Sequence, residues 1–502
     1  MVSIWLFVLL FWILPSHGSK ILVLCPYKGH SHSVVPLKIA DALWERNHNV
    51  TVASFFPKSQ VDNYTSINLK PSKAEFQAFY DIPDSILDVR DIMNDFEIEM
   101  HEYLPVLKNK DVQRLAEEKF DLVIMEYFLN DMIFGLVYQI GAPFILVHTT
   151  TPYPWMTDLF NEPHSESFMP HGLSLDRNSA GSMTFWTRLQ NFVELHFILG
   201  FYATFITPEN QRLSERYFPN ENGDPQVRTV GREASLFMVN THNSLSPPRP
   251  VLPSTIEIGG IHVSPAKPLQ EELKALMDNS KGVIFFSLGS VMRGHTMKQS
   301  RREEITNVFA SLAETILWKW ESDLLDKPAN VHTSKWFPQR DILAHPKTVL
   351  YIGHCGMLGL QEAVIEAVPT VCIPFFADQF QNAKNVIRSG MGLSVDWMNM
   401  DEDSFRKAIV QVLREPRFKV HAERTSAAFK DRPMSAKDTA VYWSEYVIRH
   451  KGAPHMKSPA RQMSWMELNN VDVIATLLVA SMILLYLVFK AVVFVLSSVL
   501  HL

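Results

Sequence analysis

Cysteine is scarce in this sequence, with only Cys25, Cys355 and Cys372 among 502 residues. Each cysteine lies in an apolar run or directly after one, and none has the spacing of metal ligands. We therefore expect no framework of disulfide bonds to hold the fold together. The three side chains are interpreted as buried thiols.

Basic clusters are also lacking, and the formal net charge is -6. This composition excludes nucleic acid as a partner. The apolar share of 47% excludes a disordered chain, and 502 residues are enough for two or three domains with substantial cores.

Long apolar runs occur near both ends of the chain. Residues 1–18 are predicted to be a secretory signal peptide, because an apolar run is followed by small residues suited to cleavage. The usual basic start is missing, which leaves an uncleaved anchor as the alternative. Residues 473–495 are predicted to be a transmembrane helix. A juxtamembrane segment (451–472) precedes this helix and a short cytoplasmic tail (496–502) follows it.

These segments predict a single-pass type I membrane protein whose main body lies in the lumen. More basic residues precede the span than follow it, which is opposite to the usual bias. Long translocated domains cross a membrane largely regardless of charge, so the luminal placement is kept. Two glycosylation sequons, at Asn49 and Asn63, fit a luminal glycoprotein.

The body of the chain alternates strand and helix patterns, which predicts an α/β fold with parallel sheets covered by helices. In the first half, a helix after the first strand is expected to have Ser33 as its cap and Pro36 in its first turn. Many prolines in residues 244–269 predict a boundary between domains 19–250 and 251–450. Ligands of such sheets bind beyond the carboxyl ends of the strands.

Two turns of small residues follow strands of the second half. One contains Ser287, Gly289 and Ser290, and the other contains His354 and Gly356 at the start of a helix. A helix start offers free N–H groups to a phosphate, and two converging turns suit a diphosphate. A mere tight turn is the alternative for either one alone.

Five further polar or aromatic residues follow strands or lie on the helix after Gly356. A carboxylate at Glu362 could accept hydrogen bonds from ribose hydroxyls, although a solvated helix surface is the competing interpretation. An indole can stack on a base, and short polar groups can bind several sugar hydroxyls. The other four candidates are Trp336, Gln339, Asp378 and Gln379.

Residues 336–379 together resemble the signature of the UDP-glycosyltransferase family, especially its membrane-bound, invertebrate-like animal members. The resemblance implies the GT-B fold, in which two Rossmann-like domains face each other across a cleft. It also implies roles in binding the donor: Trp336 and Gln339 for uracil, Glu362 for ribose, Ser290, His354 and Gly356 for the diphosphate, and Asp378 and Gln379 for the sugar. Met357 and Leu358 depart from members with polar side chains there, so backbone N–H groups must bind more of the phosphate.

Sugar transfer to a hydroxyl needs a base, and two histidines follow the first strand. Composition cannot choose between His30 and His32, but the family resemblance selects His32, which follows a serine. The resemblance also implies Glu126 as the carboxylate partner, where vertebrate relatives have an aspartate. Asp121 opens the same strand and would lie at its wrong end.

The resulting hypothesis is an inverting UDP-hexosyltransferase that needs no metal and no cofactor, with the UDP-sugar as co-substrate. Its acceptor is expected to be a small lipophilic molecule with a hydroxyl, and membrane lipid is a further partner. Apolar residues of 150–218 form either core or acceptor site. Glucose is favoured as the sugar. Glucuronate, with Arg388 or Lys384 near its carboxylate, is the alternative.

A third hypothesis is a catalytically silent membrane-bound binder of lipids or nucleotide sugars, against which the intact candidate residues argue. Residence in the endoplasmic reticulum and a role in detoxification rest on the resemblance, because the tail has no dibasic retention signal. A homo-oligomer is compatible with the sequence.

Overall fold

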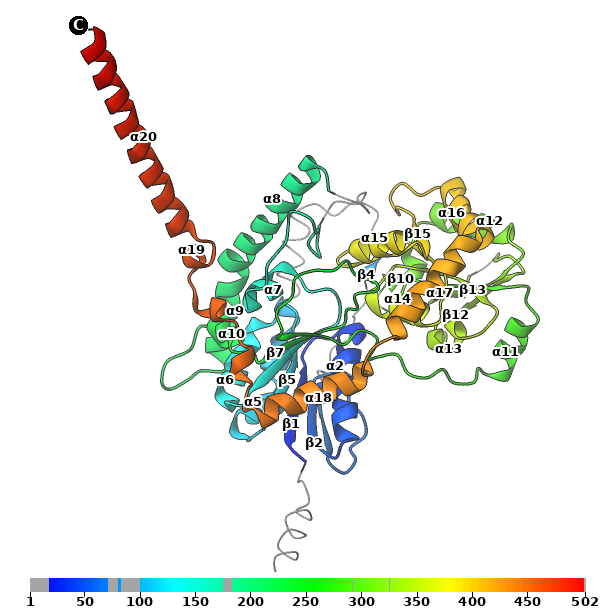
Figure 1. The fold of residues 1–502 in the computed structure, drawn as a ribbon. Helices are drawn as coiled ribbons and strands as arrows, with labels where there is room; N and C mark the ends of the chain where they lie inside the picture. Colours follow the sequence, from blue (N-terminus) through cyan, green and yellow to red (C-terminus); the bar gives the residue numbers. More distant parts are fainter. Residues whose placement is uncertain are drawn as a thin grey trace, which may run out of the picture. The chain divides into compact units, whose positions relative to one another are not determined.

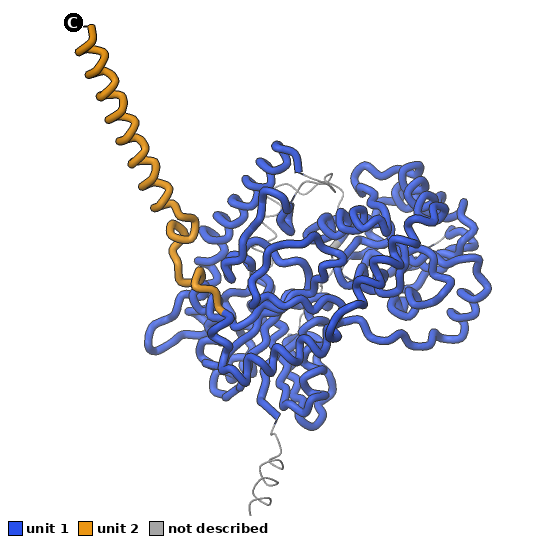
Figure 2. Tube along the Cα trace, viewed as in Figure 1, with its two compact units in different colours: residues 1–456 blue, residues 457–502 orange. Residues whose placement is uncertain are grey.

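The structure is a computed structural model that describes residues 18–70, 80–82, 100–174, 183–290, 292–324 and 326–500. The chain divides into two compact units, residues 1–456 and 457–502 (Figure 2). Apart from Gly18, the predicted signal peptide lies outside the described residues.

The first half of unit 1 contains a seven-stranded parallel sheet in the order β3-β2-β1-β5-β6-β7-β8 (Figure 1). Its strands are nearly continuous apolar runs because both faces are covered: Ile21 and Val23 join one core cluster, and Leu22 and Leu24 the other. The strands are β1 (Lys20–Cys25), β2 (Asn49–Ser54), β3 (Tyr64–Asn68), β5 (Leu122–Glu126), β6 (Phe144–His148), β7 (Leu236–Val239) and β8 (Thr255–Glu257).

The second half contains a six-stranded parallel sheet in the order β12-β11-β9-β13-β14-β15. Both sheets reverse their winding direction between neighbouring strands, at β1/β5 in the first and β9/β13 in the second. Such a reversal opens a ligand-binding crevice at the carboxyl ends of the strands. The strands are β9 (Val283–Ser287), β11 (Thr315–Lys319), β12 (Val331–Ser334), β13 (Thr348–Gly353), β14 (Thr370–Cys372) and β15 (Gly392–Ser394).

Helices cover both sheets, and a short pair, β4 (Tyr80–Asp81) with β10 (Met292–Arg293), joins the two halves. In the first half the helices are α2 (His30–Trp44), α4 (Leu104–Leu107), α5 (Lys110–Arg114), α6 (Phe134–Ile140), α7 (Pro154–Phe160), α8 (Phe185–Phe201), α9 (Thr207–Tyr217) and α10 (Val227–Arg232). In the second half they are α11 (Glu271–Asp278), α12 (Gln299–Ala310), α13 (Gln339–Leu343), α14 (Met357–Ile365), α15 (Gln379–Ser389), α16 (Glu402–Arg414), α17 (Pro416–Lys430) and α18 (Ala436–Arg449).

The last helix of unit 1, α18, packs on the first sheet rather than the second. Ala440 and Val441 share a core cluster with Ile39 and Leu43 of α2, and Figure 1 shows the two helices side by side. β8 also belongs to the first sheet, although it follows residue 250. The domain division expected from the sequence stays a prediction.

Helix α2 begins earlier than the sequence pattern predicted. Gly29 is its N-cap, so Ser33 lies inside the helix and is not its cap, and Pro36 is in the interior rather than in the first turn. Proline has no N–H to donate to the carbonyl of His32, four residues earlier. The early start places His32 in the first turn of the helix, seven residues after the end of β1.

Two of the three cysteines form a disulfide bond, so the prediction of three buried thiols is wrong for Cys355 and Cys372. The pairing of β13 with β14 sets Gly353 opposite Cys372, and Cys355 follows two residues later. Their Cα atoms are 5.3 Å apart, within the usual range for a disulfide. Cys25 is a buried free thiol, as predicted.

Unit 2 consists mainly of one long apolar helix. The short α19 (Trp465–Leu468) starts with a capping box of Ser464 and Glu467, and α20 (Val471–Leu500) follows. Its 30 residues span about 45 Å, more than the roughly 30 Å hydrocarbon core of a bilayer. In the described part of the chain, α20 alone is long and apolar enough to cross a membrane. The helix includes residues 496–500, which the sequence assigned to the tail.

Candidate active site

His32 and Glu126 lie together at the switch point of the first sheet. His32 follows β1 in the first turn of α2, and Glu126 ends the neighbouring strand β5. The His32 Nδ1 atom is 2.8 Å from Oε1 of Glu126. At the opposite end of β5, Asp121 accepts a hydrogen bond from the backbone N–H of Lys20. The geometry thus provides an imidazole oriented by a carboxylate, with Glu126 rather than Asp121 as its partner.

Glu126 is completely buried, and this burial raises the pKa of its carboxyl group. The hydrogen bond and charge of His32 oppose the shift. Oε2 of Glu126 has no hydrogen-bond partner within the described residues. The carboxylate can therefore accept only the Nδ1 proton of His32, which assigns the tautomer with an unprotonated Nε2.

Aromatic side chains surround the His32 ring. The ring centroids of Tyr27 and Phe128 lie 4.5 Å and 4.8 Å away, and that of His148 lies 6.4 Å away. Tyr153 packs on His148, with ring centroids 5.2 Å apart. The sequence analysis did not single out these four residues. Their positions at or after the ends of β1, β5 and β6 were the signal that could have found them.

His148 is a fully buried member of this aromatic group. Burial lowers its pKa to about 3, with a further effect from His32. Its two ring nitrogens lie 3.0 Å from the carbonyl oxygen of Tyr127 and 3.0 Å from the hydroxyl of Thr150. The ring is therefore neutral at physiological pH and fixed in orientation, so it shapes the surroundings of His32 without adding charge.

The two small-residue turns of the second half meet at the ring of His354. A Cβ on Gly289 would lie 2.5 Å from Cε1 of His354, and a Cβ on Gly356 would lie 2.4 Å from its Nε2. Gly289 also has φ of +83°, which side chains disfavour. Ser290 follows Gly289, and Gly356 is the N-cap of α14. The structure thus brings together the three residues predicted to bind the diphosphate.

The His354 ring is held in its neutral form. Burial lowers its pKa to about 4, and the charge of Lys319 contributes. A neutral imidazole can donate one hydrogen bond to a phosphate oxygen but carries no charge to it. Lys319, at the end of β11, was missed by the sequence analysis, and its ammonium is paired with Oε1 of Glu321 at 2.5 Å. A lysine closing a buried strand beside the switch point was the available signal.

Gln339 and Glu362 also come together. The Gln339 side-chain amide donates to Oε2 of Glu362 at 2.7 Å, and burial raises the pKa of the Glu362 carboxyl group. Trp336 precedes them in the chain and is 66% exposed. An exposed indole beside a fixed amide and carboxylate can take a base and a ribose. These roles stay predictions.

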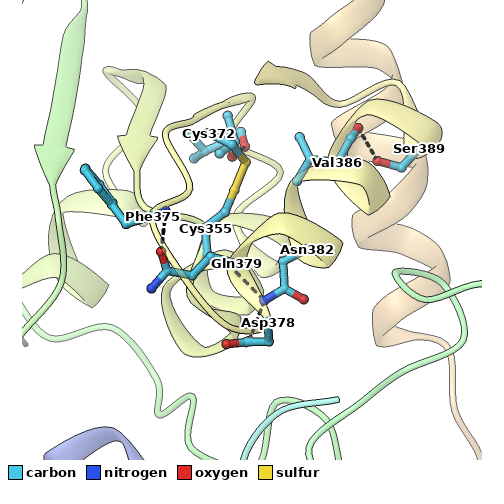
Figure 3. Close-up of a disulfide and its surroundings, with 10 residues drawn as sticks. Cys355, Cys372, Phe375, Asp378, Gln379, Asn382, Val386 and Ser389 are labelled. Atoms are coloured by element: carbon cyan, nitrogen blue, oxygen red, sulfur yellow. Dashed lines mark hydrogen bonds between the residues drawn. A yellow bond between two sulfur atoms is a disulfide. The ribbon is translucent and has the colours of Figure 1, made fainter. Parts of the chain in front are cut away.

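Asp378 and Gln379 lie at the start of α15 (Figure 3). Asn382 donates to Oδ2 of Asp378 at 2.7 Å, and Oε1 of Gln379 accepts from the backbone N–H of Phe375 at 2.9 Å. Burial raises the pKa of Asp378 to about 6, opposed by the Asn382 hydrogen bond and then by the charge of His32. The two halves also contact each other beside this site, because the Gln361 side chain of α14 donates to the backbone carbonyl of Asn240, after β7, at 2.8 Å.

The cations considered for a uronate carboxylate are held within the fold. Arg388 donates to the backbone carbonyl of Leu245, 2.7 Å away. Lys384 is 6% exposed on α15. The Arg388 guanidinium is thus tied to the segment that connects the two halves.

The apolar residues of 150–218 divide into two groups. Trp155 and Phe160 belong to the core. Helix α8 instead exposes large apolar side chains to the surroundings, and Trp186 is 72% exposed. The exposed members on α8 are Phe185, Trp186, Leu189, Phe192, Val193 and Phe197.

Comparison with known proteins shows the family of this chain. A family model described as UDP-glucoronosyl and UDP-glucosyl transferase matches residues 19–502. UDP-glycosyltransferase UGT5 of Dactylopius coccus is 34% identical over 472 residues, which cover 91% of this chain and 89% of the relative. UDP-glucosyltransferase 2 of the same organism is 33% identical, covering 92% of this chain and 90% of the relative.

Solved structures agree on the fold. The crystal structure of the kitacinnamycin glycotransferase has a TM-score of 0.56 and 18% identity, covering 86% of this chain and 99% of that one. At this identity the likeness concerns the fold alone. The predicted GT-B fold, with two parallel Rossmann-like sheets and a C-terminal apolar helix, is confirmed.

Proposed function

Because the chain belongs to the family of UDP-glucuronosyl and UDP-glucosyl transferases, which are enzymes, we propose that it transfers glucose from UDP-glucose to a small lipophilic alcohol. The transfer is a single displacement with inversion at the sugar carbon C1. One observation carries the proposal: at the switch point of the first sheet, His32 Nδ1 lies 2.8 Å from Oε1 of the buried Glu126.

In this mechanism His32 is the general base. Its Nδ1–H donates to Glu126, so Nε2 accepts the proton of the acceptor hydroxyl as the oxygen attacks C1. The new O–C1 bond forms while the bond from C1 to the phosphate oxygen breaks, and its electron pair leaves with UDP. Glu126 stabilises the imidazolium that results, and the proton passes from His32 to solvent afterwards.

The leaving diphosphate receives hydrogen bonds and the positive end of a helix dipole from the second half. The N-terminus of α14 offers backbone N–H groups after Gly356, and neutral His354 can donate one hydrogen bond. Preorganised donors of this kind suit the negative charge that develops on the departing UDP, without a metal. We therefore propose metal-independent transfer.

The donor sugar is proposed to be glucose. Asp378 and Gln379 offer a carboxylate and an amide, which suit neutral hydroxyls. A uronate carboxylate would need a nearby cation, but the Arg388 guanidinium is bonded to the carbonyl of Leu245 and Lys384 is buried at 6% exposure. The name of the Dactylopius coccus UDP-glucosyltransferase 2 also supports glucose.

The acceptor is proposed to be an apolar molecule with one accessible hydroxyl. Tyr27, Phe128 and Tyr153 provide aromatic surfaces near His32. The exposed apolar side chains of α8 and the apolar α20 support a membrane surface as the place where such acceptors concentrate.

The test uses the full-length protein in detergent. It is incubated separately with UDP-glucose and UDP-glucuronate and with mixed hydroxylated apolar acceptors, and the products are identified by mass and by the anomeric coupling in proton NMR. We expect a β-glucoside from UDP-glucose, with the same yield after chelation of divalent cations. A glucuronide alone would favour the alternative donor, and binding without any product would favour a silent binder.

The His32 role needs a matched control from the same helix turn. His32→Ala is expected to abolish transfer while leaving UDP binding intact. His30→Ala changes a ring that packs on Phe56 at 5.0 Å, and is expected to keep most of the activity. Full transfer by His32→Ala would overturn the base assignment.

We further propose that unit 1 lies in the lumen of the endoplasmic reticulum and that α20 anchors it. The acceptor asparagines Asn49 and Asn63 are both exposed. In cells, endoglycosidase H is expected to shift the mass of the protein, and substitution of both asparagines to remove that shift. A protein without glycans at either site would contradict the luminal placement.

A further inference from the structure

The disulfide joins the two parts of the proposed donor site. Cys355 stands between His354 and Gly356 in the turn assigned to the diphosphate. Cys372 ends β14, six residues before Asp378, in the segment that leads to the sugar-binding pair. Figure 3 shows the bond beside that pair. A covalent link therefore connects segments that must bind adjoining groups of one ligand.

A second link connects the same two segments. Asn382 is completely buried, and its side-chain amide donates to the carbonyl of Cys355 at 3.0 Å and to Oδ2 of Asp378 at 2.7 Å. The backbone of Cys355 has φ of +59°, a region that side chains disfavour. The disulfide and the Asn382 hydrogen bond thus both hold this turn, whose backbone has an unusual conformation.

We propose that the Cys355–Cys372 disulfide and Asn382 are positioning elements that set the spacing between the diphosphate turn and Asp378. This inference rests on the proposed function. One C–O bond joins the diphosphate to the sugar, so both parts of the donor are recognised only when the two protein segments keep a matching distance. Fixing that distance before binding saves the ordering that binding would otherwise require.

The burial of both cysteines favours this role over exchange with thiols in solution. Cys355 is 1% exposed and Cys372 is 0% exposed. A bond that served stability alone would affect every part of the ligand equally, whereas a positioning bond affects the diphosphate and sugar and spares the uridine. Of the uridine residues, Trp336 and Gln339 belong to other elements. Glu362 lies on α14, which begins at the diphosphate turn, but its carboxylate is held by the Gln339 amide of α13 at 2.7 Å.

The test compares inhibition constants for uridine, UDP and UDP-glucose on full-length protein. One variant, Cys355→Gly with Cys372→Ala, removes the bond and suits the left-handed backbone at position 355. A second, Asn382→Ser, removes the other link and keeps the disulfide. We expect both variants to bind uridine within about twofold of wild type, UDP more weakly, and UDP-glucose about tenfold more weakly, with the acceptor KM unchanged.

Peptide mapping without reductant tests the bond itself. Wild-type protein should yield the Cys355 and Cys372 peptides joined, and recovery of both as alkylated thiols would overturn the inference. Equal loss for uridine and UDP-glucose in both variants, or no loss for UDP-glucose, would overturn it too. Wild-type protein that does not bind UDP would instead overturn the proposed function, and this inference with it.

Discussion

Glu126→Gln tests the orientation of His32 most sharply, because it keeps the shape of the side chain and removes its charge. Once His32 has taken the acceptor proton, its imidazolium and the Glu126 carboxylate, 2.8 Å apart, attract each other by about 6 kcal/mol at an effective dielectric constant of about 20. Burial of Glu126 offsets part of this attraction. The imidazolium that forms during transfer loses this attraction in the Gln variant, and a loss of about 3 to 5 kcal/mol in the transition state lowers kcat by roughly 10² to 10⁴.

The stability of the same variant should move in the other direction. The pKa of Glu126 is raised by burial, so at neutral pH its ionised form opposes folding, and the neutral amide removes that penalty. The melting temperature is therefore expected to stay equal or rise. Glu126→Asp keeps the charge but withdraws it by about 1.5 Å, and should give an intermediate kcat. A Gln variant with more than about a tenth of the wild-type kcat would refute the role of the carboxylate.

Three further predictions concern the donor. Asp378 has a pKa raised to about 6, so its carboxylate becomes protonated as the pH falls through that value. UDP-glucose should then bind more weakly while UDP binding is unaffected. Titration calorimetry at several pH values would detect this pH dependence, and Asp378→Asn should abolish it. Gly289→Ala places a Cβ 2.5 Å from the His354 ring, so it should raise the inhibition constant of UDP by roughly tenfold or more and leave that of uridine unchanged. Unchanged UDP binding would contradict the convergence of the two turns. Trp336→Ala removes stacking worth about 1 to 3 kcal/mol and should raise the UDP dissociation constant roughly 5- to 150-fold. The melting temperature should stay the same because the indole is 66% exposed. A large drop in melting temperature would identify Trp336 as a core residue instead.

The sheets and the second-half turns could be predicted because their signals are local. Buried parallel strands are short apolar runs, and small or polar residues directly after them mark the ligand edge. His354, Gly356 and Asp378 each follow a strand in this way, and the structure brings their segments together. The turn at Gly289 meets His354 because Gly289 follows β9 and His354 follows β13, and these two strands are neighbours at the switch point of the second sheet.

The features that were missed depend on contacts between distant parts of the chain. The disulfide arises from the register of β13 against β14, which counting cysteines cannot reveal. Phe128 approaches His32 only because β1 and β5 are neighbours, although the two strands are far apart in sequence. The start of α2 was misplaced because Ser33 and Pro36 suit a helix start locally, whereas the chain continues the helix back to Gly29.

Paired single-turnover assays of glucose transfer test the central claim most directly. Wild-type, His32→Ala and Glu126→Gln proteins, each saturated with UDP-glucose, receive one lipophilic alcohol that the wild type accepts, and the glucoside is quantified by mass. The proposed mechanism predicts equal UDP-glucose binding by all three proteins, no glucoside from His32→Ala and a rate reduced by orders of magnitude in Glu126→Gln. Wild-type rates in both variants would contradict it.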